Sequence, residues 1–152
     1  MTNNDVLRRL RYTFDYSDDQ MIEIFEEADV TVTRPQISDW MKKEEDEAYI
    51  NLTDKNLAVF LNGMINKYRG KREGEQPKPE QKLDNNLVFK KLKIALNLRS
   101  EDILALFELA EMPITKNELT SFLRQKKQPQ YQQLLDQYLR NFLTGLQFKY
   151  RK

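Results

Sequence analysis

Apolar residues recur at three- and four-residue steps along most of the chain, a spacing that predicts amphipathic α-helices. Near the start, Val6, Leu10 and Phe14 share one face of the first predicted helix. Four such helices follow one another in the first half of the chain and four more in the second half. Their expected ranges are about 4–14, 18–28, a short helix after Thr33 and 54–69, then about 86–96, 100–110, a short helix after Thr115 and 130–151. The predicted fold class is therefore all-α.

Polar residues mark where several of these helices begin. Asp18 and Ser100 are the expected N-caps of the second helix in each half, because their side-chain oxygens can accept a hydrogen bond from a free backbone N–H. The third helix opens in both halves with a Thr-x-x-Gln or Thr-x-x-Glu capping box, at Thr33 and at Thr115.

Gly63 and Gly145 stand in the middle of the last predicted helix of each half. A glycine inside a helix costs about 1 kcal/mol relative to alanine. We therefore expect a close helix crossing at each glycine, with no room for a side chain. This is a role in packing.

The two halves are copies of one another. Setting residue n against residue n+82 aligns 3–70 with 85–152 without a gap and gives 18 identities in 68 pairs. Residues 71–84, KREGEQPKPEQKLD, break the match with a glycine, two prolines and alternating charges, a composition typical of a linker. We predict a first four-helix repeat over 1–70, a linker over 71–84 and a second four-helix repeat over 85–152. We expect the repeats to pack around an internal pseudo-two-fold axis.

Three stretches carry a family resemblance. They are the duplicated opening (NNDVLRRLR at 3–11 and NNLVFKKLK at 85–93), WMKKE at 40–44 and FLNGMINKYRG at 60–70. With the doubled pattern, the chain resembles the YehS-like family of bacterial domains of unknown function over its full length. The resemblance implies a small cytoplasmic bacterial protein of two related all-helical repeats, and it supplies no catalytic residues.

The residue types present restrict the chemistry. The chain has no cysteine and no histidine, so it has no thiolate nucleophile, no cysteine zinc site and no imidazole base. The acidic run KKEEDE at 42–47 lacks the spacing of a calcium loop, and the second repeat replaces it with RQKKQP at 124–129. We therefore predict no enzymatic activity, no metal site and no cofactor.

The pattern also bears on location. Apolar runs reach five residues, too few to cross a membrane, and the first residues, MTNNDV, are not those of a signal peptide. We expect a cytoplasmic protein with no membrane partner.

Charge is divided unevenly between the repeats. Residues 3–70 hold 9 Lys and Arg against 14 Asp and Glu, whereas residues 85–152 hold 12 against 6. Such asymmetry is evidence about partners. It fits contact between the two repeats, head-to-tail self-association or an anionic ligand on the second repeat. Drift of two solvated faces after the duplication explains it equally well.

Two further features bear on nucleic-acid binding. The second and third helices of each repeat have a helix-turn-helix-like outline, with Ile37 and Trp40 expected to face inward. Their turn is longer than in the usual motif and has no glycine. The first helix of each repeat also carries a basic cluster, which could neutralise phosphates or simply form a solvated face. These clusters are Arg8, Arg9 and Arg11, and Lys90, Lys91 and Lys93.

Two binding functions remain open. One is a nucleic-acid-binding regulator that uses the basic second repeat. The other is an adaptor that recognises a protein partner or a second copy of itself. The basic clusters favour the first and the acidic first repeat favours the second. The residues expected to contact phosphates are Lys90, Lys91, Lys93, Lys116, Arg124, Lys126 and Lys127.

Overall fold

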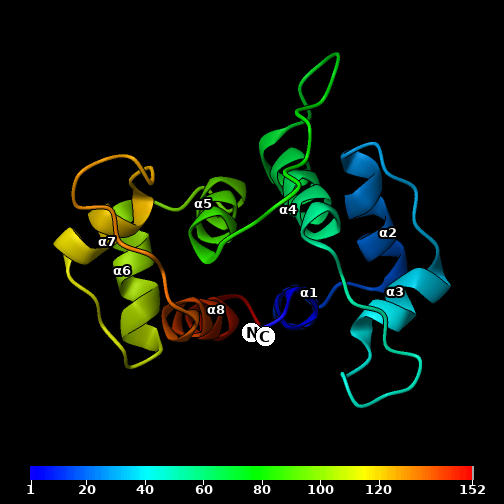
Figure 1. Cartoon of the computed structure of the whole chain (residues 1–152), viewed down its shortest axis with the longest axis horizontal. Helices are drawn as coiled ribbons and strands as arrows, with labels where there is room; N and C mark the ends of the chain where they lie inside the picture. Colours follow the sequence, from blue (N-terminus) through cyan, green and yellow to red (C-terminus); the bar gives the residue numbers. More distant parts are fainter. Residues whose placement is uncertain (152) are drawn as a thin grey trace.

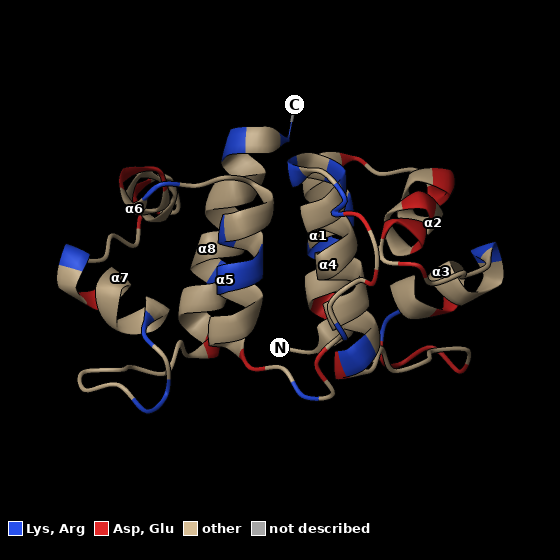
Figure 2. Ribbon diagram, turned by 90° about the horizontal axis from the view of Figure 1, so that it is seen from above, with Lys and Arg blue, Asp and Glu red and all other residues tan. Residues whose placement is uncertain are grey.

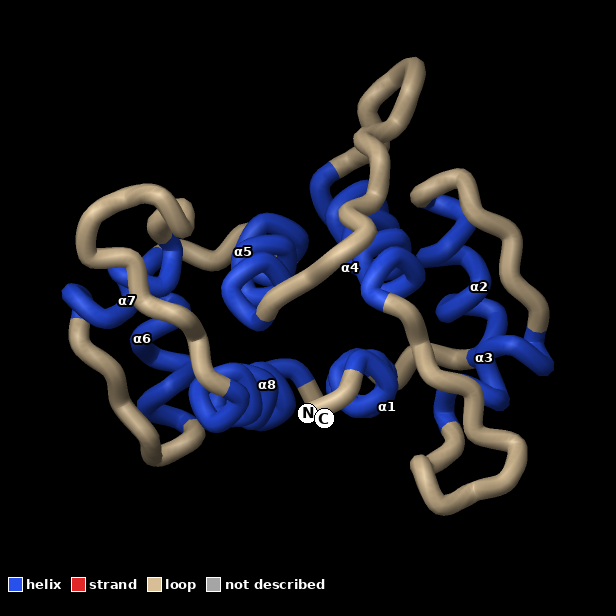
Figure 3. Tube along the Cα trace, in the orientation of Figure 1, coloured by secondary structure: helices blue, strands red, loops and turns tan. Residues whose placement is uncertain are grey.

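The computed structural model describes residues 1–151, which form eight α-helices and no β-strand (Figure 1, Figure 3). The first repeat contains α1 (Asn3–Phe14), α2 (Asp18–Glu27), α3 (Arg34–Met41) and α4 (Asp54–Arg69). The second repeat contains α5 (Asn85–Ala95), α6 (Ser100–Leu109), α7 (Lys116–Leu123) and α8 (Asp136–Tyr150). The predicted all-α class with two four-helix repeats is confirmed.

The predicted N-terminal caps of the helices are confirmed in part. The capping boxes that begin at Thr33 and Thr115 are both formed. The predicted N-caps of α2 and α6 are each wrong by one residue. Ser17 caps α2, because its Oγ accepts the N–H of Gln20, and the residue before α6 is Arg99, whose own N–H donates to a side chain of the first turn.

The last helix begins later than predicted, at Asp136 rather than near residue 130. The buried side chain of Asn86 accepts the N–H of Leu134 and donates to the carbonyl oxygen of Gln132. These bonds use backbone groups that a helix over this segment would need for its own first turns. The segment is therefore a loop.

Four helices, α1, α4, α5 and α8, lie in the centre (Figure 2). Contacts between their first residues place all four N-terminal ends at the same end of the molecule. Hydrogen bonds join those ends. Asn3 Nδ2 donates to Asp54 Oδ1 over 2.7 Å, and Asn85 Nδ2 donates to Asp136 Oδ1 over 2.8 Å. The hairpins α2–α3 and α6–α7 pack on opposite flanks of these four helices (Figure 1).

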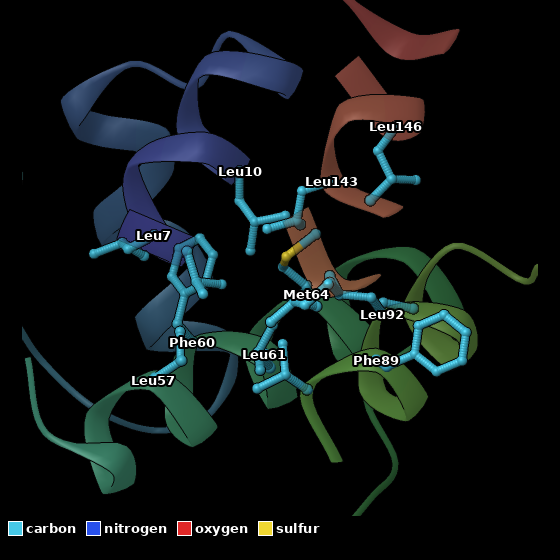
Figure 4. Packing of buried hydrophobic residues seen from close by; sticks show 14 of the residues in the cluster. Leu7, Leu10, Leu57, Phe60, Leu61, Met64, Phe89, Leu92, Leu143 and Leu146 are labelled. Carbon is cyan, nitrogen blue, oxygen red and sulfur yellow. The ribbon is translucent and has the colours of Figure 1, made fainter. Parts of the chain in front are cut away.

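The repeats meet along two seams. The α4–α5 seam and the α1–α8 seam each join one helix of the first repeat to one of the second. Since α1 corresponds to α5 and α4 to α8, the seams are reciprocal, as the predicted pseudo-two-fold axis requires. Four buried side chains, one from each helix, converge between them (Figure 4): Leu10, Met64, Leu92 and Leu143.

The mid-helix glycines mark close crossings within each repeat. A Cβ on Gly63 would lie 1.9 Å from the backbone oxygen of Ile24, and a Cβ on Gly145 would lie 2.2 Å from that of Leu106. Both distances are far inside van der Waals contact. Glycine therefore lets α4 cross α2, and α8 cross α6, at a distance that any side chain would prevent, as predicted.

Candidate anion-binding surface of the second repeat

The second asparagine of each repeat fixes the loop between the third and fourth helices. In the second repeat, Asn86 Nδ2 donates to the carbonyl oxygens of Phe122 (3.0 Å) and Gln132 (2.9 Å), and its Oδ1 accepts the N–H of Leu134 (2.8 Å). Asn4 makes the equivalent three bonds in the first repeat, to Trp40, Ile50 and Leu52. The repeated Asn-Asn opening is therefore a structural clamp, and both loops are held in the same way.

The two loops have the same backbone turns and opposite charge. In loop 42–53 the N–H of Asp46 donates to Lys43 and the N–H of Tyr49 donates to Asp46. In loop 124–135 the equivalent N–H groups, 82 residues later, make the same two bonds. The first loop begins KKEEDEAY and the second RQKKQPQY. We call 42–53 the acidic loop and 124–135 the basic loop.

A cleft of about 510 Å³ lies between the start of α5 and the basic loop. Lys90 Nζ donates to the carbonyl oxygen of Arg124 over 3.1 Å, which ties α5 to the first residue of the loop. The carboxylate of Asp84 lies 3.3 Å from Lys126 Nζ. The Nε of Arg124 is buried without a partner in the described part of the chain. Four cations line this basic-loop cleft: Lys82, Lys90, Arg124 and Lys126.

The structure brings three of the seven residues predicted to contact phosphates, Lys90, Arg124 and Lys126, into this cleft. The other four lie elsewhere. Lys127 is exposed on the basic loop, and Lys93 lies one turn farther along α5 than Lys90. Lys116 is exposed in the first turn of α7, at the opposite end of that helix from Arg124.

Lys91 does not lie on this surface. Only 9 % of the surface of Lys91 is exposed. Its Nζ contacts Asn62 Oδ1 at 2.6 Å and Glu80 Oε1 at 3.1 Å. These contacts join α5 to α4 and to the linker. The sequence placed Lys91 in a basic cluster, but it could not show that this position faces the other repeat. It also missed Lys82, because that residue stands in the predicted linker.

Two cations on the first helix of the first repeat, Arg8 and Arg11, have carboxylate partners. Arg8 donates to the carbonyl oxygen of Lys42, as Lys90 does to Arg124, but it also pairs with Asp5. Arg11 Nη2 lies 2.7 Å from Asp18 Oδ1. The four carboxylates of the acidic loop, residues 44–47, add negative charge nearby. The first repeat therefore has the same loop backbone and clamp with the opposite electrostatic character.

The helix-turn-helix-like hairpins are packed as predicted, with Ile37 and Trp40 buried. Arg34, at the start of α3, pairs with Asp19 of α2 over 2.7 Å. Among residues 1–151, no cluster of carboxylates is arranged to hold a metal ion, and no helix is long and apolar enough to span a bilayer.

The two-repeat helical architecture has counterparts among known sequences. The family described as "Protein of unknown function (DUF1456)" matches residues 3–70 and again residues 85–152. The chain belongs to this family. It is 36 % identical over 147 residues to the uncharacterized protein YehS of Escherichia coli (strain K12), a match that covers 96 % of this chain and 94 % of that protein. No solved structure matches the chain. The YehS-like resemblance seen in the sequence is confirmed.

Proposed function

We propose that this protein is a non-enzymatic nucleic-acid-binding module that contacts phosphates through the basic-loop cleft. The observation that carries the proposal is that four cations from the linker, α5 and the basic loop line one cleft with a single carboxylate, Asp84, and that Asn86 fixes the loop. A cationic groove of this kind binds a phosphate backbone by releasing its counterions. Tyr131 also lines the cleft and offers a ring on which a base can stack.

The first repeat supplies an internal control for this proposal. Its loop has the same turns and the same asparagine clamp, but Glu44 and Glu45 stand where the second repeat has Lys126 and Lys127. An interaction that depends on loop shape alone would use both repeats. One that depends on phosphate charge would use only the second.

The test is a salt titration of binding to labelled single-stranded and duplex DNA and RNA, followed by fluorescence anisotropy. The double variant Lys126→Glu, Lys127→Glu places at these two positions the glutamates that the acidic loop carries there. Each phosphate contact contributes about 0.9 to the slope of log affinity against log salt on duplex DNA. If both lysines contact phosphates, the slope falls by about 1.8 in this variant.

The matched control is Lys55→Glu, Lys78→Glu, which changes net charge equally at two exposed residues outside the cleft. This control should keep the wild-type slope. The reciprocal variant Glu44→Lys, Glu45→Lys should bind more tightly than wild type. Two outcomes would remove the proposal. One is an equal loss of affinity in the Lys126→Glu, Lys127→Glu variant and in the Lys55→Glu, Lys78→Glu control. The other is wild-type binding weaker than about 10⁻⁴ M at low salt.

A second candidate function is self-association, favoured by the opposite charges of two loops that lie on opposite flanks (Figure 3). The acidic loop of one molecule would meet the basic loop of the next in a head-to-tail contact, which can extend into a chain. Sedimentation velocity at low and high salt tests this candidate. A monomer at every protein concentration in low salt would remove it.

A further inference from the structure

A second cleft, of about 390 Å³, lies along the α1–α8 seam between the two repeats. Its walls come from one side of α1, along most of the helix, and from α8. Residues that line it and enter the argument are Asp5, Arg8, Arg9, Arg140 and Gln147. This cleft is distinct from the basic-loop cleft, since the two share no residue.

Two guanidinium groups in this cleft lack a carboxylate partner within residues 1–151. Arg9 is half-buried and donates from Nη2 to Thr144 Oγ1 over 2.9 Å, while Arg140 is exposed on α8. Burial and the nearby charge of Arg140 lower the pKa of Arg9, and Asp5 offsets part of this effect. The charge of Arg140 also helps to lower the pKa of Asp136, one turn earlier on α8, but the two side chains form no ion pair. Two like charges therefore face a common space with incomplete compensation.

The carboxylate of Asp5 is already engaged. Burial alone would raise the pKa of Asp5, but hydrogen bonds from Thr2 and the charge of Arg8 hold it below its ordinary value. Its Oδ2 accepts the N–H of Thr2 over 2.9 Å and its Oδ1 pairs with Arg8. Asp5 thus stays ionised but is held by other groups than Arg9 and Arg140.

The α4–α5 seam shows how the same position is satisfied in the other half. Lys91 occupies the place equivalent to Arg9, and Asn62 the place equivalent to Thr144, so the two hydrogen bonds across the seams correspond. Lys91 also forms an ion pair with the carboxylate of Glu80, a residue of the linker. The linker runs once along the molecule, and its Glu80 lies at the α4–α5 seam. Within residues 1–151, Arg9 has no counterpart of Glu80.

We propose that the α1–α8 cleft binds the phosphate group of a small phosphorylated ligand, held between Arg9 and Arg140. The ligand anion takes the role that Glu80 has at the other seam. Two guanidinium forks match the charge and the planar hydrogen-bonding pattern of a phosphate dianion. The volume of the cleft falls in the range of small-molecule sites, so it has room for an ester group beyond the phosphate. This site goes beyond the proposed nucleic-acid contact and does not depend on it.

The test is isothermal titration calorimetry at low salt with pyrophosphate and with AMP. The seams supply the variants: Arg140→Ala introduces the residue that α4 carries at the equivalent position, Ala58, and Arg9→Lys introduces the residue of α5. Arg140 is exposed, so its removal should leave the fold intact, which circular dichroism checks. Arg99→Ala, at another exposed arginine, is the matched control.

We expect Arg140→Ala to weaken both ligands about tenfold or more, since a hydrogen bond to a charged group contributes at least that factor. Arg9→Lys should weaken them less, and Arg99→Ala and the Lys126→Glu, Lys127→Glu variant should bind as wild type does. No binding of either ligand by wild type at millimolar concentration, or unchanged binding in folded Arg140→Ala, would overturn the proposal.

Oligonucleotide binding separates free phosphates from a nucleic-acid backbone. If Arg140→Ala weakens an oligonucleotide as much as it weakens AMP, the cleft belongs to a nucleic-acid surface, and the small-ligand proposal is wrong. If oligonucleotide binding responds only to the basic-loop variant, the two sites are separate, as we propose.

Discussion

The two seams between the repeats began as equivalent surfaces and now differ in polarity. The α1–α8 cleft is lined by Asp5, Arg140 and Gln147, and the equivalent positions of the other repeat carry Leu87, Ala58 and Ile65. Ala58 is completely buried, and the α4–α5 seam is joined to the linker by Lys91 and Glu80. The α1–α8 seam is hollowed into a cleft with two partly uncompensated guanidinium groups. The four buried side chains at the centre (Leu10, Met64, Leu92 and Leu143) hold the repeats together, and one seam is left free to acquire a polar surface.

The largest effect is expected when a residue of one seam is replaced by its equivalent from the other seam, which tests whether the two seams differ. Ala58→Arg places a guanidinium where the native residue has no exposed surface, and should destabilise the fold by about 4 kcal/mol or more. Arg140→Ala should change the free energy of unfolding by less than about 0.5 kcal/mol. Urea denaturation measures both. Similar effects of the two substitutions would mean that the seams are not distinct.

The glycines test what the repeats still share. Gly63→Ala and Gly145→Ala each force a Cβ against a backbone oxygen, and each should cost about 3 kcal/mol even though alanine is the better helix former. Thermal or urea unfolding of the two variants gives the comparison. A gain in stability in either variant would show that its helices separate easily at that crossing.

The asparagine clamps test whether the loops differ only in charge. Asn4→Ala and Asn86→Ala each remove the partner of one buried carbonyl oxygen, one part-buried carbonyl oxygen and one buried N–H, and should each cost about 2 kcal/mol. Hydrogen exchange of Leu52 and Leu134 reports the loss locally. Much faster exchange in one repeat alone would show that the loops are held differently.

The smallest expected effect concerns Asp136 at the N-terminal end of α8. The hydrogen bond from Asn85, and then the charged N-terminus, lower its pKa below the ordinary value of 3.8. A carboxyl group with a lowered pKa in the folded state contributes stability above its unfolded pKa, and this contribution is lost as pH falls through the folded pKa. Asn85→Ala should therefore raise the pKa of Asp136 and weaken the stability gained above pH 4. Side-chain carbon NMR of Asp136 during a pH titration measures the shift. An unchanged pKa would show that Asn85 is not its main partner.

Much of the architecture could be predicted from periodicity and repetition. The eight helices, the Thr33 and Thr115 caps and the crossings at Gly63 and Gly145 each depend on local spacing or on a residue type with a specific cost. The pairing of helices across the repeats could not be predicted, because an amphipathic face does not name its partner. For that reason Lys90 and Lys91 looked alike, although one lines a cleft and the other joins the repeats.

The candidate sites were harder to predict than the fold. The opposite charges of residues 42–47 and 124–129 were visible, but the clamp that gives both loops one shape depends on hydrogen bonds from Asn4 and Asn86. For the α1–α8 cleft a signal did exist in the aligned repeats. Ala58 of one repeat corresponds to Arg140 of the other, a change from a small apolar residue to a cation that indicates different surroundings.

The common direction of α1, α4, α5 and α8 sets a minimum length for the chain between the repeats. After α4 ends at Arg69, the chain must travel back along the whole helix before α5 can begin at Asn85. The 16 residues of α4 span about 24 Å, a distance that needs at least about seven extended residues. A shorter connection would keep α5 from its own α4 and leave each seam to be completed by another molecule, as a domain-swapped dimer. In the observed structure the two repeats are arranged like the two subunits of a two-fold dimer. Segment 70–84 joins them, so their association is intramolecular.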